Sequence, residues 1–130
     1  MSARFRSEDR IRKQTDFDRV YRARIYAADD VLVINGQTNG LARSRLGLSV
    51  SRKVGGAVVR NRWKRLIREA FRLSRENLPV GIDLVVRPQK EAVAALEPIQ
   101  QSLIMLAGRI ARRVERGKSE VRDQKSQSKE

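Results

Sequence analysis

The sequence contains no cysteine and no histidine among its 130 residues. Without cysteine, the chain has no disulfide, no thiolate nucleophile and no cysteine-based metal site. Without histidine, it lacks the usual general base near neutral pH and the commonest metal ligand. No stretch approaches about 18 consecutive apolar residues, and the amino terminus has no secretory apolar core, so neither a transmembrane helix nor a signal peptide is predicted. We therefore expect a soluble cytoplasmic protein that does not bind membranes.

Acidic residues are also scarce compared with basic ones. The chain has 29 lysines and arginines against 15 acids, which gives a formal net charge of +14. Residues 43–75 hold eleven of the basic residues and a single acid, Glu69, so this segment contributes ten of the fourteen charges. Positive charge this dense attracts polyanions, and repulsion among the charges destabilises the compact folded state. The charge distribution therefore predicts a nucleic-acid partner for this segment.

Residues 57–75 predict an amphipathic helix. At about 100° per residue, one side is apolar and includes Trp63, which we expect in the core. The opposite arc carries mainly cations: Arg60, Asn61, Lys64, Arg65, Arg68, Arg72 and Arg75. Like charges four residues apart destabilise a helix by about 0.2–0.5 kcal/mol per pair, so we expect an external polyanion to neutralise this face. Arg62 lies about 100° round from Asn61, near Glu69, and we predict that Arg62 is partly structural or touches another part of the polyanion.

The other elements follow from periodicity and from turn residues. We expect a mobile arm over residues 1–13, and then a short helix over about 15–24 with Thr15 as its N-cap. Strands are predicted at 31–35, 45–51 and 82–87, with a further strand possible at 39–45. A helix is predicted over 99–116, with a helical start over 89–97 that is interrupted at Pro98; the arginines at its carboxyl end suit the helix dipole. These elements predict a single domain over residues 1–116 and a disordered basic tail over 117–130.

Several features leave two interpretations open. Phe17 and Tyr21 either pack on the sheet or stack on a nucleobase. The bare glycine and serine face of strand 45–51 either admits a close helix or forms a smooth floor with basic rims. Gly55-Gly56 is either a phosphate-binding loop or a flexible turn. The acidic pairs Glu8-Asp9 and Asp29-Asp30 are expected on the solvated surface and are only a weak signal for magnesium.

The run SRKVGGAVVRNRWKRLIREAFR at residues 51–72 closely resembles the signature of the bacterial ribonuclease P protein component. Arg60-Asn61-Arg62, Lys64-Arg65, Arg68-Glu69 and Phe71-Arg72 match the motif position by position. Weaker matches extend the resemblance over roughly residues 10–115. It implies an α+β fold, a two-layer sandwich of order α-β-β-β-α-β-α similar to a domain of ribosomal proteins. It also implies a left-handed β-α-β crossover, against the general right-handed rule.

The resemblance further implies a ribonucleoprotein that removes the 5′ leader from precursor tRNA. In such a complex the RNA cleaves the phosphodiester bond with magnesium that the RNA mainly holds, so no catalytic or metal-binding residue is assigned to this chain. The residues implied to dock on the catalytic ribonuclease P RNA are Arg52, Lys53, Arg60, Asn61, Arg62, Lys64, Arg65, Arg68 and Arg72. The residues implied to contact the leader are Phe17, Tyr21, Arg45, Ser49 and Arg87.

Two other functions are compatible with a basic helix. The first is an RNA-binding assembly module that resembles a ribosomal protein and has no processing activity. The second is a DNA-binding regulator, which is disfavoured because a helix that reads base edges would offer more Asn, Gln and Ser than this one does. We therefore expect no DNA partner.

Overall fold

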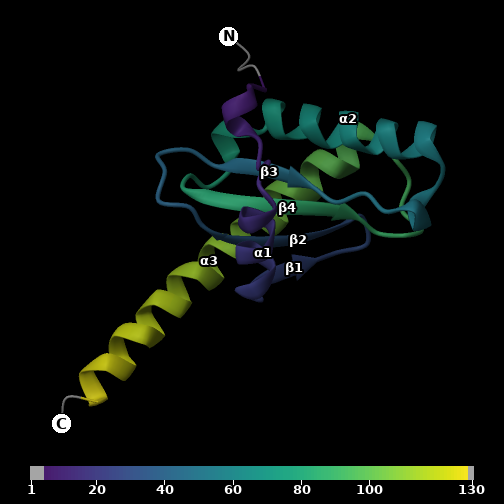
Figure 1. Ribbon diagram of the computed structural model, residues 1–130. Helices are drawn as coiled ribbons and strands as arrows, with labels where there is room; N and C mark the ends of the chain where they lie inside the picture. Colours follow the sequence, from purple (N-terminus) through teal and green to yellow (C-terminus); the bar gives the residue numbers. More distant parts are fainter. Residues whose placement is uncertain (1–4, 129–130) are drawn as a thin grey trace.

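The computed structural model describes residues 5–128, and the side chains of residues 5–116. The helices and strands follow in the order α1 (Gln14–Arg22), β1 (Tyr26–Ala28), β2 (Leu32–Thr38), β3 (Arg45–Leu48), α2 (Ala57–Leu73), β4 (Ile82–Pro88) and α3 (Leu96–Ser128). Short 3-10 turns lie at Ser7–Asp9, Arg52–Val54 and Arg75–Asn77. The predicted α-β-β-β-α-β-α order is confirmed (Figure 1).

The four strands form one mixed sheet in the order β1-β2-β4-β3. Strand β2 pairs antiparallel with β1 and with β4, whereas β3 and β4 are parallel neighbours. The parallel pair needs a crossover connection, and α2 supplies it. Strand β4 therefore pairs with β2 on one side and with β3 on the other, although it is the last strand in the chain.

Helices α2 and α3 cover one face of the sheet and enclose the main core (Figure 1). Trp63, which is 1% exposed, lies in this core, as the sequence predicts. The sheet and α3 approach each other closely at Gly36 on β2, where a Cβ atom would lie 2.4 Å from Cγ2 of Ile110. A side chain at this position would force α3 away from the sheet.

Helix α1 lies on the other face of the sheet, which we call the open face. Val20, Ile11 and Val85 form a small second core there, and Phe17 packs against it. A Cβ atom on Gly47 would lie 2.9 Å from Cε1 of Phe17. The bare face of β3 therefore admits a helix at this point, which is one of the two interpretations that the sequence left open.

The amino-terminal segment differs from the prediction of a mobile arm, as far as the described residues extend. Ile11 is buried, and its N–H donates a hydrogen bond of 3.0 Å to the carbonyl oxygen of Leu46 on β3. The Thr15 N-cap was wrong, because α1 begins at Gln14 with Lys13 in the N-cap position. Residues 1–4 lie outside the described part of the chain.

Two further boundaries differ from the sequence-based expectation. The additional strand is β1, and residues 39–44 form an irregular segment with bends at 40–43 instead of a strand. Residues 89–95 are not helical, and α3 begins at Leu96 with Pro98 in its first turn, where a proline is tolerated because its missing N–H has no helical partner there.

Helix α3 continues to Ser128, through much of the segment for which the sequence predicts disorder. The side chains of residues 117–128 and the whole of residues 129–130 lie outside the described part. The division into a domain over 1–116 and a basic tail over 117–130 stays a prediction.

Candidate nucleic-acid interface

The buried carboxylate of Asp83 on β4 binds two arginines, Arg19 on α1 and Arg45 on β3. Its side chain is fully buried and lies 2.5 Å from Nη2 of Arg19. Arg45 donates to both of its oxygens, from Nε at 2.8 Å and from Nη2 at 2.6 Å. Asn39 Nδ2 donates a further bond of 2.9 Å. Arg45 was expected to contact a ligand; its partly buried guanidinium is bound by Asp83, and this hydrogen bond raises the pKa of Arg45.

A second buried carboxylate, Asp9, fixes the amino-terminal segment to the end of α2. Nη2 of Arg75 lies 2.9 Å from Asp9 Oδ2, and Nη1 of Arg43 lies 3.5 Å from Oδ1. Burial opposes ionisation of Asp9, but the hydrogen bonds from Arg75 and from the backbone N–H of Arg6 hold its pKa below the ordinary value of 3.8. Asp9 was expected on the solvated surface, and that expectation was wrong because the segment docks on the domain.

The lowered pKa of Asp9 predicts a stability that depends on pH. Its pKa is lower in the folded than in the unfolded state, so the unfolded state binds more protons in acid. The carboxylate therefore stabilises the fold fully above its unfolded pKa, and this contribution is lost as the pH falls through the lower, folded pKa. The difference in unfolding free energy between wild type and Asp9→Asn should shrink between about pH 6 and about pH 3 in urea titrations.

The control for this prediction is Asp30→Asn, which removes the same charge from an exposed position. This variant should stay close to wild type at both pH values. A difference between wild type and Asp9→Asn that stayed constant in acid would contradict the assigned role of Asp9.

Glu69, the only acid on α2, pairs with Arg72. Nε of Arg72 donates to Glu69 Oε2 at 3.1 Å, and Nη2 contacts Oε1. The hydrogen bond from Arg72 lowers the pKa of Glu69. Arg62 is exposed and forms no ion pair with Glu69 among the described residues, which gives no support for a structural role. Its alternative role, contact with another part of the polyanion, stays a prediction.

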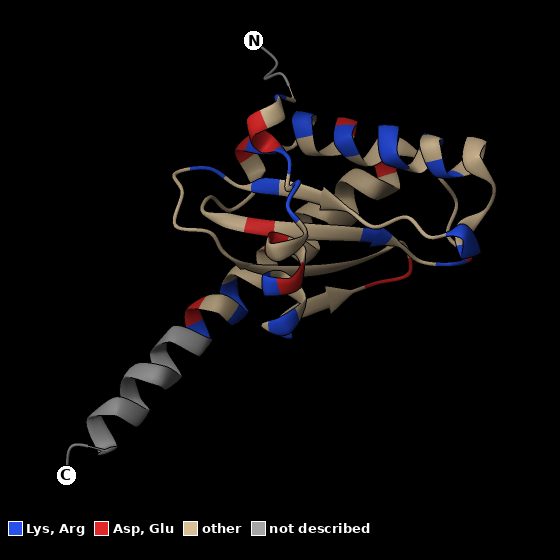
Figure 2. Ribbon diagram, in the orientation of Figure 1, with Lys and Arg blue, Asp and Glu red and all other residues tan. Residues whose placement is uncertain are grey.

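The remaining cations of α2 have no acidic partner in the described part of the chain. Figure 2 shows basic residues repeated along the helix. They comprise Arg60, Arg62, Lys64, Arg65 and Arg68, with Asn61 between them. Arg60 Nε is buried and has no hydrogen-bond partner among the described residues. Burial and the nearby charges of Arg10 and Arg65 lower the pKa of Arg68, so this surface carries uncompensated positive charge.

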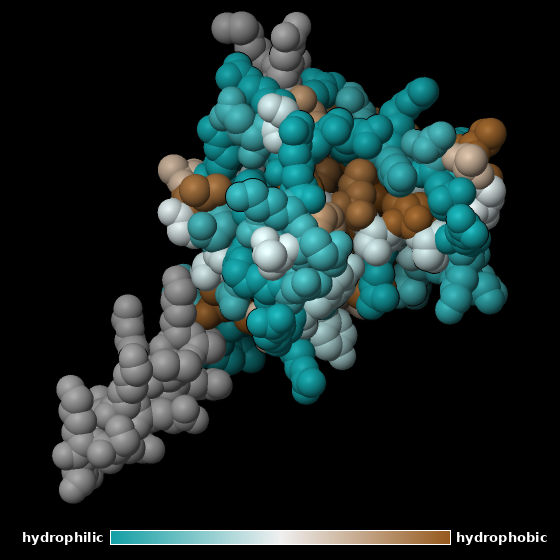
Figure 3. Space-filling view, viewed as in Figure 1, coloured by the Kyte–Doolittle hydropathy of each residue, from teal (hydrophilic) through white to brown (hydrophobic). Residues whose placement is uncertain are grey.

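Two of these cations border a hollow of about 220 Å³ between α2 and the amino-terminal segment. Lys64 and Arg68 form one wall, and Phe17 forms part of the floor. Figure 3 shows apolar surface beneath the hydrophilic side chains of α2. The opposite wall holds Phe5 and Arg10, whose guanidinium lies 5.5 Å from the centre of the Phe5 ring. An aromatic floor between cationic walls is suited to a nucleotide, with a base against the ring and phosphate against the cations.

A second hollow, of about 290 Å³, lies at the carboxyl ends of β3 and β4. Ser49 and Arg87 line it together, as expected for residues of one site. Lys53 and Lys90 add positive charge to its rim, and Val33 contributes an apolar surface. Lys53 was grouped in the prediction with the cations of α2, but here it borders the same hollow as Ser49. Phe5, Arg10 and Lys90 also line these hollows, and sequence reasoning did not name them as candidates.

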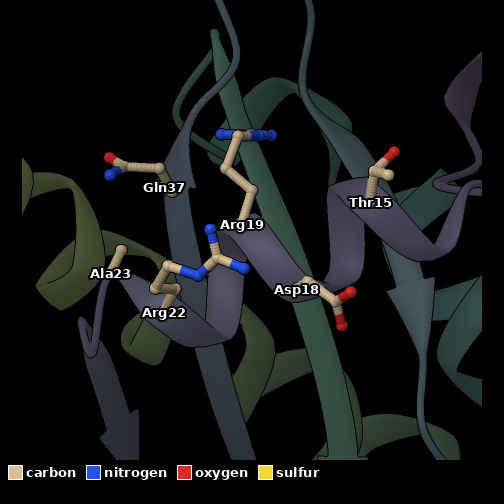
Figure 4. Close-up of a pocket in the computed structure, with 6 residues that line it drawn as sticks. All are labelled: Thr15, Asp18, Arg19, Arg22, Ala23 and Gln37. Atoms are coloured by element: carbon tan, nitrogen blue, oxygen red, sulfur yellow. The ribbon is translucent and has the colours of Figure 1, made fainter.

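The third hollow, of about 390 Å³, lies between α1 and β2. Figure 4 shows its lining side chains, which include Arg19, Arg22 and Gln37. Arg19 is already engaged by Asp83, and Nη1 of Arg19 donates to the carbonyl oxygen of Thr38 at 2.6 Å. Tyr21 is on α1 but does not line any of these three hollows, although its side chain is 38% exposed. The residues predicted for one ligand, Phe17, Tyr21, Arg45, Ser49 and Arg87, therefore lie at four different places.

The acids of the described chain are poorly arranged for metal binding. No three of them cluster within the described residues in a way that could hold an ion. Asp29 accepts hydrogen bonds from the backbone N–H groups of Val31, at 2.8 Å, and Leu32, at 2.9 Å, so it caps a turn. No helix within the described residues is long and apolar enough to cross a membrane.

Comparison with known proteins identifies the family. The Ribonuclease P family model matches residues 5–111. The ribonuclease P protein component of Brevibacillus brevis is 46% identical over 98 residues, which cover 73% of this chain and 77% of that protein. That of Desulfovibrio desulfuricans is 47% identical over 109 residues, which cover 79% and 83%.

Solved structures agree with the sequence comparisons. The ribonuclease P protein from Thermotoga maritima has a TM-score of 0.70 at 34% identity, over 77% of this chain and 96% of that one. The Staphylococcus aureus protein has a TM-score of 0.67 at 35% identity, over 75% and 91%. The matched region contains both the buried carboxylates and the unpaired cations of α2, and the chain belongs to the ribonuclease P protein family.

Proposed function

We propose that this chain is the protein subunit of ribonuclease P, which binds the catalytic RNA and the 5′ leader of precursor tRNA and assists removal of the leader. The observation that carries the proposal is the division of the arginines into two groups. Those that contact Asp9, Asp83 or Glu69 are paired with a carboxylate of the protein itself. Those on the exposed side of α2 lack such partners in the described structure and lie together.

The α2 cations are suited to a folded RNA backbone. Guanidinium groups bind phosphate oxygens through two parallel hydrogen bonds, and their repulsion within α2 is relieved when phosphates lie among them. The face has only Asn61 to read a base edge, so contact with the backbone explains it better than sequence recognition does. We assign Arg60, Lys64, Arg65 and Arg68 to the RNA component, with Arg52 and Arg62 at the margins and Arg72 shared with Glu69.

We assign the leader to the open face of the sheet. The hollow lined by Ser49, Arg87 and Lys53 offers hydroxyl and cationic groups over an apolar surface, which suits a single strand. Phe17 contributes its ring in the other hollow, beside α2. Arg45 then acts indirectly, because its bonds to Asp83 hold the strand and α1 in place.

Hydrolysis is assigned to the RNA component and its bound magnesium. The protein has neither histidine nor cysteine, and the two buried carboxylates among its described residues are already engaged by arginines. These donors do not fit a magnesium site, which requires carboxylate and carbonyl oxygens that are free to bind the ion. The contribution of this chain is to bind and orient RNA.

One assay separates this function from that of an RNA-binding assembly module. Purified protein is mixed with bacterial ribonuclease P RNA and precursor tRNA at low magnesium, and mature 5′ ends are measured. The proposed function predicts that the protein restores cleavage that the RNA alone performs poorly under these conditions. Tight binding of the RNA without restored cleavage would favour the assembly module, and cleavage by the protein alone would overturn the assignment of chemistry to RNA.

A further inference from the structure

A second group of cations lies on α3, apart from the residues assigned above. Arg109, Arg112, Arg113 and Arg116 are all exposed. At about 100° per residue they fall within an arc of about 100°. We call these four residues the α3 arginine face. The buried Ile110 and Val114 point away from it, so one side of the helix packs and the other presents four guanidinium groups.

No acidic partner among the described side chains of α3 accounts for this concentration of charge. The sequence alone places these arginines at a carboxyl end, where the helix dipole favours cations, but α3 continues to Ser128 and they lie within it. Glu115, the only acid between residues 98 and 116, forms no ion pair in the described structure. Of the four arginines, Arg109 is the one that interacts electrostatically with Asp29. Like charges three and four residues apart destabilise a helix, so the α3 arginine face has a destabilising arrangement that an external anion would relieve.

The fold holds the α3 arginine face in a fixed position. Ile110 sits against Gly36, where there is no room for a Cβ atom. The N–H of Gly36 also donates a hydrogen bond of 2.9 Å to the carbonyl oxygen of Ile25, which ties the start of β1 to the same point. Val114, one turn further along α3, is 5% exposed. The arginines therefore extend from a backbone that is anchored on the sheet.

The chemistry and position of the α3 arginine face favour RNA as its binding partner. Planar guanidinium groups match phosphate oxygens. A membrane is disfavoured, because the apolar side of this helix lies in the core and has nothing to insert. Helices α2 and α3 cover the same face of the sheet, opposite the open face to which we assign the leader (Figure 1). A large folded RNA docked on α2 can extend along this face to α3, whereas the hollow of Ser49 and Arg87, to which we assign the leader, lies on the open face.

We propose that the α3 arginine face binds the phosphate backbone of the RNA component at a second segment, separate from the one on α2. This inference rests on the proposed function. The test is the triple variant Arg112→Gln, Arg113→Gln, Arg116→Gln of the full chain, compared with wild type for binding to ribonuclease P RNA across a salt series. The charge-matched control is Arg6→Gln, Arg12→Gln, Lys13→Gln, which neutralises three exposed cations near the amino terminus.

The α3 variant should bind the RNA component about 10- to 100-fold more weakly, with a slope of log affinity against log salt that is shallower by about 2, since each phosphate contact contributes about 0.7–0.9. Backbone footprinting should lose one protected segment and keep the segment protected by α2. The control should keep both segments and nearly all of the slope. Thermal melting should show that both variants fold.

Each of the other possible outcomes would contradict the proposal or the proposed function on which it rests. An unchanged slope and footprint for the α3 variant, with wild type binding normally, would overturn the proposal and leave an acidic protein as the partner of this face. An equal loss in the control would overturn it as a non-specific charge effect. A loss confined to precursor tRNA binding would reject the RNA component as the ligand. If wild type failed to bind the RNA component at all, the proposed function itself would fall.

Discussion

Replacing Lys64 and Arg68 together by glutamate is expected to weaken binding to ribonuclease P RNA by about 100- to 10,000-fold. These two side chains form the α2 wall of the hollow that also holds Phe17. Each charge-assisted hydrogen bond to phosphate is worth about 1.5–3 kcal/mol, and about 1.4 kcal/mol corresponds to tenfold in affinity. The slope of log affinity against log salt should become shallower by about 1.4–1.8. Filter binding at several salt concentrations measures both quantities.

The matched control reverses two charges that lie elsewhere, in Arg12→Glu, Lys13→Glu. Both residues are exposed and have no acidic partner in the described structure. The control has the same net charge as the α2 variant, so any difference between them reports position and not total charge. Equal losses of affinity in the two variants, with both folded, would contradict the assignment of α2 as the docking surface.

Removing the carboxylate of Asp83 should produce the largest loss of stability of any single change considered. Asp83→Ala leaves Arg19 and Arg45 without their buried partner, and breaking a buried pair in this way costs about 3–5 kcal/mol. Small domains are stable by only about 5–15 kcal/mol, so the variant should be close to unfolding. Urea denaturation followed by circular dichroism measures the change.

Arg45→Ala separates the two roles considered for that arginine. A purely ligand-binding Arg45 would be replaced at little cost to folding, whereas an anchor for Asp83 would destabilise the protein markedly. Asp30→Ala is the control, because Asp30 is exposed. The role of Asp83 would be refuted by an Asp83→Ala variant as stable as Asp30→Ala.

The fold was largely predictable because the signals that specify it are local. The apolar stripe around Trp63, the alternation along residues 82–87 and the spacing along α3 each indicate a buried face. The structure places most of those residues in the core, although Val59 and Leu73 at the ends of the stripe are exposed. Strand β1 escaped prediction because it has only three residues, with just one of them, Ala27, buried. A pattern this short has no detectable period.

The partners of the arginines could not be predicted, because they are set by contacts between distant residues. Asp9 and Arg75 are 66 positions apart, and Arg19 and Asp83 are 64 apart. Nothing in the sequence near Arg45 distinguishes it from Arg87, yet the first is held by Asp83 and the second is exposed in a hollow. Sequence reasoning identified a basic surface correctly, but it could not separate the cations that hold the protein together from those left available.

The position of β4 in the sheet bears on how the chain folds during synthesis. Strand β3 has no neighbouring strand until β4 emerges, only an isolated bridge with Arg10, and β2 until then has only the three residues of β1. Arg19 and Arg45, which pair with Asp83 in the folded protein, are likewise synthesised tens of residues before it. A nascent chain that has reached residue 80 therefore lacks the central ladder of its sheet, and most of its tertiary structure forms only once residues 82–88 and the helix after them have left the ribosome.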